Sequence, residues 1–435
     1  MKKIIFILTL VLMTFGANQS KANNYIWMHG LYDDNNCWSI YNNALTPGIG
    51  TCIYYSCKQG IPSAATKTWN NSDPSTSGST YFNINGKRDM ILVGHSLGGL
   101  VAREMQYQYA NQKDVYGNPK VKGIITMGTP NEGAQIENEL ANKGVKGLAS
   151  KVTLKFEVST GLSIASLISI FPYSLVSGVT TGYKFVSFIE TFKSAALDKA
   201  MGSFANGTQT CEKQMRVGST YMNDTLANRK VTVPILCFAA EEDRWQLARL
   251  AYTAQGRPTL QSDANINSTG TYDQTGYDYM QSGVNVSNII GEVHTGIAAA
   301  CVGIGFACPY YWYVGGLNGV AAASWFGNAS YLNNGLDFDH AVLVGASHVD
   351  RIDTWHKVWF VKWVTTQYIT VPEPHDGVVP TKSQYLATSK GTNVIIPTST
   401  IKGVNHMEEF NHPNTKAELN KAIVLGGTYP PSFKK

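Results

Sequence analysis

The chain is 435 residues long, 43% hydrophobic and 15% charged, a composition that fits a folded globular protein and excludes a disordered one. The length exceeds the usual size of one hydrophobic core, so we expect one large core with insertions or two domains. The net charge is only +5, with no basic stripe and no acidic tail, so no nucleic-acid partner is expected.

Residues 1–22 have the pattern of a secretory signal peptide. Lys2 and Lys3 precede the apolar run 4–13, and Ser20 and Ala22 place small residues at the two positions that cleavage requires. The apolar run is too short to span a membrane stably, so no transmembrane segment is expected. The sequence therefore predicts a secreted or periplasmic protein whose mature chain covers residues 23–435.

Seven cysteines in an exported chain predict disulfides, with one cysteine left over. The pairs favoured by closeness along the chain are Cys52 with Cys57 and Cys301 with Cys308. Cys237 lies inside the apolar run 233–240 and is the predicted free thiol, whereas a Cys37–Cys211 pair stays open.

The first strand after the leader is predicted at Tyr25–Met28, and it runs into His29, Gly30 and Leu31. A second strand is expected over residues 49–55. Residues 63–79 are rich in Ser, Thr, Asn and Pro, which predicts a surface loop.

The most informative motif is a glycine-flanked serine between a strand and a helix. Met90–Val93 is typical of a buried parallel strand, the turn 94–99 has the sequence GHSLGG, and a helical pattern follows. Small residues two positions either side of Ser96 let the helix pack against the strand. The turn also aims the Leu97 N–H, at a helix N-terminus, toward an oxyanion beside Ser96. Ser96 is therefore the predicted nucleophile.

With this motif in place, the chain resembles the secreted bacterial lipases and esterases of the α/β-hydrolase superfamily. The same resemblance is carried by HG at 29–30, GTPNEG at 128–133, DGVVP at 376–380 and NHMEE at 405–409. It implies an α/β fold with a mostly parallel central sheet and helices on both faces. It also implies that the Leu31 N–H joins that of Leu97 in an oxyanion hole, that His29 is structural, and that GTPNEG has no chemical role.

Two insertions into this fold are predicted. After a strand expected at 121–128, residues 145–205 are densely apolar around Pro172, and the resemblance places a helical lid there; extra core packing is the alternative. After a strand expected at 231–240, residues 255–335 are poor in charge, turn-rich at first and then small and aromatic. This loop-rich, aromatic segment either walls an acyl-chain cleft or packs as a cap.

Several polar residues near position 350 have spacings that suggest metal ligands. They are His340, His348, Asp350, Asp353 and His356. No established metal motif accompanies them, and tryptophans at 355, 359 and 363 recur at helix spacing. We predict a solvated amphipathic helix rather than a metal site.

A serine nucleophile needs a histidine base and an acid that orients it, in the chain order Ser, acid, His in this fold. His406 follows the strand-like run 393–396 and precedes an acidic pair, as in the lipases, so it is the predicted base. Asp376 follows the strand-like run 367–371 in the DGVVP motif and is the predicted acid. Asp243 also follows a predicted strand and is the alternative acid, although a long insertion separates it from His406.

These residues predict an exported serine hydrolase that cleaves carboxylic esters of lipids at a lipid–water interface, without a cofactor. A structural Ca²⁺ occurs in similar lipases, but this sequence has no recognisable calcium loop. The alternatives on the same triad are a phospholipase, a thioesterase or a lipid acyltransferase. An inactive binding protein is the alternative of a different class. The sequence predicts neither acyl-chain length, nor substrate-binding residues, nor oligomeric state.

Overall fold

A computed structural model describes residues 23–31, 38–70, 89–114, 116–139, 141, 209–242, 275–304, 309–330, 334, 336–358, 361–410, 412–424 and 427–434. The predicted leader (1–22) and the predicted lid (145–205) lie outside these ranges.

A six-stranded sheet with the order β2-β1-β3-β4-β5-β9 forms the centre of the molecule, and all its neighbouring strands are parallel. Its strands are β1 (Asn24–Met28), β2 (Gly50–Ile53), β3 (Met90–His95), β4 (Val121–Met127), β5 (Ile235–Phe238) and β9 (Val394–Ile395). Each lies within or overlaps a strand predicted from its apolar run, so those predictions are confirmed. A short parallel pair joins β6 (Ala240–Glu241) to β10 (Ile401–Lys402).

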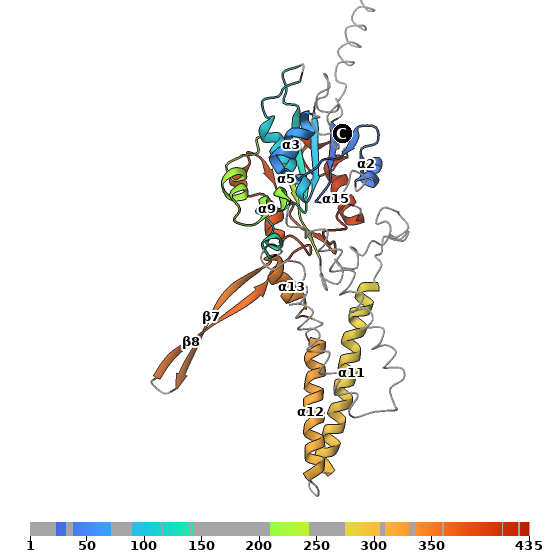
Figure 1. The fold of residues 1–435 in the computed structure, drawn as a ribbon, viewed down its shortest axis with the longest axis vertical. Coiled ribbons are helices and arrows are strands. Elements are labelled where there is room, and N and C mark those ends of the chain that lie inside the picture. The colour runs from blue at the N-terminus through green and yellow to red at the C-terminus, as the bar shows by residue number, and fades with distance from the viewer. Residues whose placement is uncertain are drawn as a thin grey trace, which may run out of the picture.

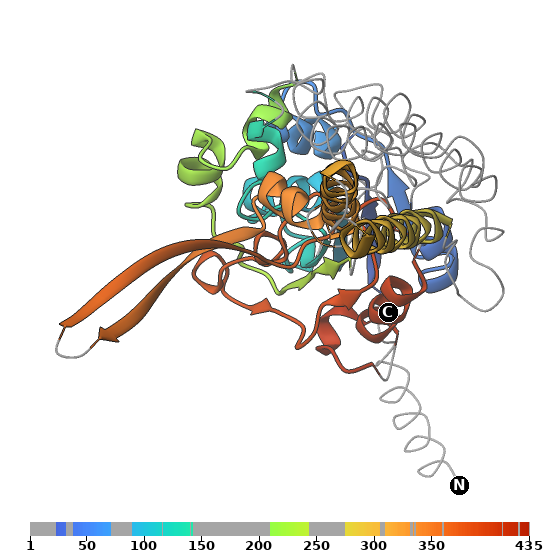
Figure 2. The same ribbon diagram turned by 90° about the horizontal axis from the view of Figure 1, so that it is seen from below.

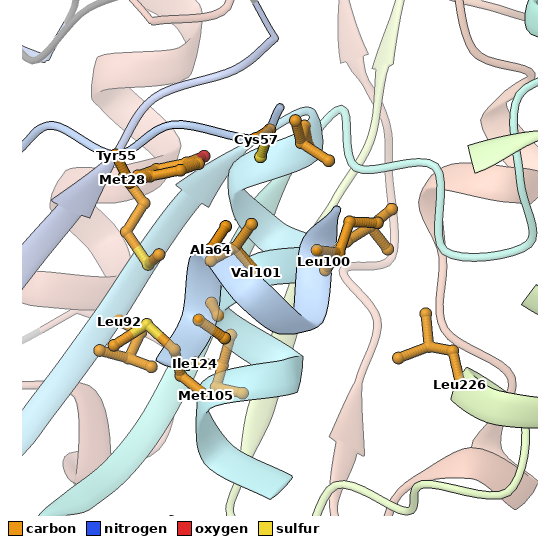
Figure 3. Close-up of a cluster of buried hydrophobic side chains, with 14 of the residues drawn as sticks. Met28, Tyr55, Cys57, Ala64, Leu92, Leu100, Val101, Met105, Ile124 and Leu226 are labelled. Atoms are coloured by element: carbon orange, nitrogen blue, oxygen red, sulfur yellow. The ribbon is translucent and has the colours of Figure 1, made fainter. Parts of the chain in front are cut away.

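Helices cover both faces of this sheet. Alternate residues of each strand point to opposite faces, and because both sets are apolar, each face packs against helices in a buried cluster of its own. On one face, α3 (Ile61–Asn70) and α5 (Leu97–Gln108) pack with Ile26 and Met28 in a buried cluster that Figure 3 shows. On the other face, α2 (Ser39–Leu45) and α15 (Pro413–Ile423) pack with Tyr25 and Trp27. The predicted fold class is confirmed: the chain has an α/β-hydrolase fold.

The prediction of a surface loop at 63–79 is wrong for residues 63–70, which belong to α3. Ala64, Ala65 and Trp69 lie on the buried side of this helix, within the cluster shared with α5. The polar residues of this segment are typical of a loop, but burial of its apolar side stabilises a helix. The remaining residues, 71–79, lie outside the described ranges.

Two pairs of elements extend away from the sheet (Figure 1). The prediction of a loop-rich segment at 255–335 is wrong for most of its length, because α11 (Thr275–Ile304) and α12 (Pro309–Ser330) are long helices that lie side by side in both views (Figure 2). No described helix is both long enough and apolar enough to cross a membrane. After α13 (Leu336–Val344), the antiparallel strands β7 (Ser347–Val358) and β8 (Val361–Pro372) form a separate hairpin.

The predicted amphipathic helix around residue 350 is therefore wrong. Most of its polar residues lie on β7, whereas His340 lies on α13 and is fully buried. Burial lowers the pKa of His340 to about 3, so it is neutral and not solvated. The β-branched and aromatic residues of β7 and β8, such as Val349, Ile352 and Trp355, favour strands over the helix that the tryptophan spacing indicated.

The favoured Cys52–Cys57 pair is not formed. Both cysteines are free, because Cys52 packs against the cluster on one face of the sheet and Cys57 belongs to the cluster on the other. Cys57 instead lies beside Cys211, and burial together with this neighbouring thiol raises the pKa of Cys57 well above its usual range. Cys237 is a buried free thiol as predicted, and Cys37 and Cys308 lie outside the described residues.

Substitution of Gly98 tests how closely the turn at Ser96 packs against β1. A Cβ at this position would lie 2.6 Å from the carbonyl oxygens of both Met28 and His29, which are backbone atoms of β1 and its turn. We expect Gly98→Ala to lower the free energy of unfolding by about 1–3 kcal/mol, measured as a lower melting temperature. The matched control is Gly316→Ala on α12, where a Cβ meets nothing within 4 Å, and its melting temperature should not fall.

Candidate active site

Ser96 lies at the carboxyl end of β3, immediately before α5, in a backbone conformation that L-residues rarely adopt. Its φ is +52°, and its N–H donates to the Met127 carbonyl of the adjacent strand at 2.9 Å. This strained turn holds the serine side chain at the sheet edge where the strands end. The local geometry therefore agrees with the elbow predicted from GHSLGG.

The structure brings together the predicted serine, base and acid. Nε2 of His406 lies 2.9 Å from the Ser96 Oγ, and Nδ1 of His406 lies 2.8 Å from Oδ2 of Asp376. Because an ionised carboxylate only accepts hydrogen bonds, Nδ1 carries the proton and Nε2 is left to accept from the serine hydroxyl. All three side chains are buried.

The loop after β8 holds Asp376 ionised in this buried place. Its Oδ1 accepts the N–H groups of Val378 and Val379 at 2.8 and 2.7 Å, in a turn that Gly377 allows with a φ of +96°. Burial alone would raise the pKa of Asp376, but His406 and the two backbone donors outweigh it and lower the pKa. Asp243, the alternative acid, lies outside the described residues.

A second layer of ionisable side chains lies directly beneath the triad. His95 donates from Nε2 to the His406 carbonyl at 3.0 Å, and the same nitrogen lies 3.2 Å from Oε2 of Glu409. Burial lowers the pKa of His95 well below its usual range, so His95 is neutral. Burial, followed by the negative charge of Asp376, raises the pKa of Glu409 well above its usual range, so Glu409 is protonated at neutral pH.

The burial of a protonated Glu409 should make the free energy of unfolding depend on pH. In the unfolded chain its carboxyl ionises near pH 4.3, whereas in the folded protein it stays protonated, so rising pH favours unfolding. We expect Glu409→Gln to gain melting temperature over wild type as the pH rises above that value. Its amide replaces a neutral carboxylic acid, so activity should be retained within a few-fold.

The control for this measurement is Glu418→Gln on α15. The Glu418 carboxylate pairs with Lys421 on the surface and should contribute little. A constant difference in melting temperature between Glu409→Gln and wild type from pH 4 to 8 would contradict a protonated Glu409.

The predicted oxyanion segment lies beside the serine. A Cβ at Gly30 would lie 3.1 Å from Cβ of Ser96, so the turn after β1 touches the elbow. A cavity of about 240 Å³ opens there, and its described lining includes Leu31, Leu97, Tyr54, Tyr55, Lys58 and Gln209. Leu31 and Leu97, whose N–H groups were predicted to bind the oxyanion, thus line one cavity next to Ser96.

Two motifs assigned no chemistry make structural contacts. The ring of His29 accepts the Tyr55 N–H at Nε2, while the Tyr55 hydroxyl donates to the His29 carbonyl. Asn131, from GTPNEG, accepts from Nη1 of Arg103 at 3.0 Å and donates to the Gln384 carbonyl at 2.8 Å. These bonds fix the loops that follow β1 and β4 around the site.

The sequence did not identify the cavity residues or the layer beneath the triad. Lys58 and Gln209 come from segments with no motif, and only folding places them at the same cavity. The sequence identifies Glu409 as part of the acidic pair after His406, but it does not indicate that Glu409 is buried. Among the described residues, His95, His406 and Glu409 are spaced closely enough for a metal ion, yet both ring nitrogens of His406 are already engaged, Nε2 by Ser96 and Nδ1 by Asp376.

Residues 79–182 match the family model described as the PGAP1-like alpha/beta domain. This match covers less than half of the chain and includes β3, the elbow, α5 and β4. A search of curated proteins found no match to the chain.

Several solved structures are similar at low identity. EstA from Clostridium botulinum is 12% identical, with 91% of this chain and 85% of that chain covered and a TM-score of 0.36. The type II thioesterase YbtT from the yersiniabactin pathway is 13% identical, with coverages of 52% and 77% and a TM-score of 0.28. Phospholipase PlaB from Legionella pneumophila is 13% identical, with coverages of 52% and 41% and a TM-score of 0.28. The α/β-hydrolase fold itself rests on the parallel sheet, the strained serine between β3 and α5, and the family match at that segment.

Proposed function

We propose that the chain is an exported serine hydrolase that cleaves carboxylic esters of lipids through an acyl-enzyme. The observation that carries this proposal is the continuous hydrogen-bonded chain from Ser96 through His406 to Asp376, beside a cavity lined by Leu97, the residue that follows Ser96. No other described group of side chains joins a strained serine to a base and an ionised acid. The proposal of export rests on the leader sequence at 1–22.

The geometry supports a two-step acyl transfer. Nε2 of His406 takes the Ser96 proton as Oγ attacks the ester carbonyl, and the Leu31 and Leu97 N–H groups stabilise the oxyanion. Asp376 holds the imidazole in the tautomer that accepts this proton and stabilises the imidazolium that forms. His406 then protonates the leaving alcohol, and a water molecule activated by the same imidazole releases the acid. No step in this scheme calls for a cofactor.

The walls of the cavity are consistent with an acyl ester as substrate. Tyr54, Tyr55 and the leucines present apolar surface, while Lys58 and Gln209 add polar groups. Such a site binds an apolar chain and orients a polar ester beside Ser96.

The test is hydrolysis of a panel of substrates by the mature protein: carboxylic esters of increasing chain length, an acyl-thioester and a phospholipid. We expect carboxylic esters to be cleaved with the highest kcat/KM, and Ser96→Ala to cleave none of them. A preference for the thioester would make the protein a thioesterase, and release of acyl chains from phospholipid alone would make it a phospholipase. Absence of turnover on every substrate would contradict the proposal.

A further inference from the structure

The pair α11 and α12, which we name the helical hairpin, lacks the charged outer face that a surface helix normally has. No Asp, Glu, Lys or Arg occurs between Glu292 and Asp337, a range that includes all of α12. Earlier in α11, Asp278 and Glu292 are the charged residues, and neither helix contains Lys or Arg. A helix on the surface of a protein in water ordinarily turns charged residues outward.

Two polar side chains of the hairpin, one from each helix, are buried against each other, although other polar residues of α11 are exposed. His294 on α11 and Asn318 on α12 are 2% and 0% exposed, and their Nδ1 and Oδ1 atoms are 2.8 Å apart. The Asn318 amide also donates to the Val314 carbonyl at 2.9 Å, so it is satisfied within the hairpin. Ser287 is buried in α11 as well.

Small residues let the two helices approach each other. Ala321, Ala322 and Ala329 of α12 are buried, and the Phe326 ring packs over Gly291 of α11. Larger apolar residues also fill the contact, namely Val284, Ile290 and Trp325. The contact is therefore a mixture of polar, small and large side chains.

The outer side of α12 carries an apolar stripe at helical spacing. Tyr310, Tyr313, Leu317 and Val320 follow one another at i, i+3, i+7 and i+10, and their exposed fractions are 66%, 66%, 47% and 68%. Val302, near the same end of the hairpin on α11, is 41% exposed. A buried polar pair between the helices and an uncharged, exposed apolar stripe on α12 mark this side of the hairpin as an interaction surface.

We propose that the outer stripe of the helical hairpin, Tyr310, Tyr313, Leu317 and Val320, binds the surface of a lipid bilayer. Its lack of charge matches the uncharged acyl region, and tyrosines at one end suit the boundary with water, where their hydroxyls stay hydrated. Because neither helix has a basic residue, the attraction is apolar and does not require anionic lipid.

The hairpin is attached to the body at the edge that carries the candidate active site. Described segments on both sides of the hairpin in the chain lie at that edge: the Glu242 N–H donates to the His375 carbonyl at 3.0 Å, and the centroid of the His340 ring on α13 lies 5.1 Å from that of the His375 ring, next to Asp376. The binding itself is separate from the chemistry proposed at Ser96.

The test is flotation of the full mature chain with neutral phosphatidylcholine vesicles. We expect wild type and Ser96→Ala to float equally, and the double variant Tyr313→Lys/Leu317→Lys to bind at least tenfold more weakly. The matched control is Tyr116→Lys, an apolar residue that is 63% exposed on the body and should leave binding unchanged. The double variant alters exposed positions only, so its circular dichroism, melting temperature and hydrolysis of a short soluble ester should equal those of wild type.

Three results would overturn this inference. The first is a wild-type protein that stays unbound with neutral vesicles. The second is binding restricted to anionic vesicles and abolished by salt, since that attraction is electrostatic. The third is a wild-type oligomer in solution that the double variant converts to a monomer, which would assign the stripe to a second copy of the chain. Loss of vesicle binding with intact ester hydrolysis separates this proposal from that for Ser96.

Discussion

Ser96→Ala should abolish ester hydrolysis, with kcat reduced by at least about 10⁴-fold and the fold unchanged. Among the described residues, Ser96 is the one whose hydroxyl is hydrogen-bonded to the base, with its Oγ 2.9 Å from Nε2 of His406, so it is the atom placed to attack a carbonyl. The measurement is kcat for a soluble short-chain ester, with circular dichroism and melting temperature to show that the variant folds.

A second serine beside the cavity provides the control. Ser56 also lines the cavity, but the structure gives its hydroxyl no histidine partner. Ser56→Ala should therefore keep most of the wild-type turnover. Retention of most activity by Ser96→Ala, in a folded variant, would contradict the assignment of the nucleophile.

Asp376→Asn should lower kcat by about 10⁴-fold. In the wild type, Nδ1 of His406 lies 2.8 Å from the Asp376 carboxylate. In the variant, an amide N–H group or an uncharged oxygen would face Nδ1 instead. The imidazole would then favour the tautomer protonated at Nε2, which cannot accept the Ser96 proton, and the imidazolium would lose its counter-charge. The measurement is the pH profile of kcat for the same ester.

The control for this experiment is Asp243→Asn, because Asp243 is the acid that the sequence left as the alternative. We expect this variant to retain wild-type turnover. A large loss in Asp243→Asn together with a small loss in Asp376→Asn would reverse the assignment of the acid.

The parts of the fold that could be predicted are those with local signals. Each strand of the main sheet is a short apolar run, and the elbow at Ser96 is a strand, a turn and a helix within a few residues. Asp376 and His406 were predicted because the resemblance and the chain order limited the choice. The hydrogen bonds that join Ser96 to His406 and His406 to Asp376 then depend on these segments meeting at one edge of the sheet.

The parts that could not be predicted depend on contacts between distant segments or on an unusual surface. The helix α3 was not predicted because its sequence contains many polar residues, and the contact that stabilises it is the packing of its buried side against α5, which is a distant segment of the chain. The helical hairpin showed no clear periodicity because its outer stripe is as apolar as its inner contact, so the contrast that identifies an amphipathic helix is missing. Glu409 could be read from the sequence as an acid, but only its burial beside Asp376 makes it neutral.

The most direct test of the central claim, that Ser96 is an activated nucleophile, is labelling of the mature protein with a fluorophosphonate followed by mass spectrometry of its peptides. An activated serine displaces fluoride and becomes phosphonylated, whereas an ordinary serine does not react. We expect one adduct per chain, on the peptide that contains Ser96, with Ser96→Ala unlabelled and Asp376→Asn labelled far more slowly. A folded wild-type protein that remains unlabelled, or that is labelled at another serine, would contradict the claim.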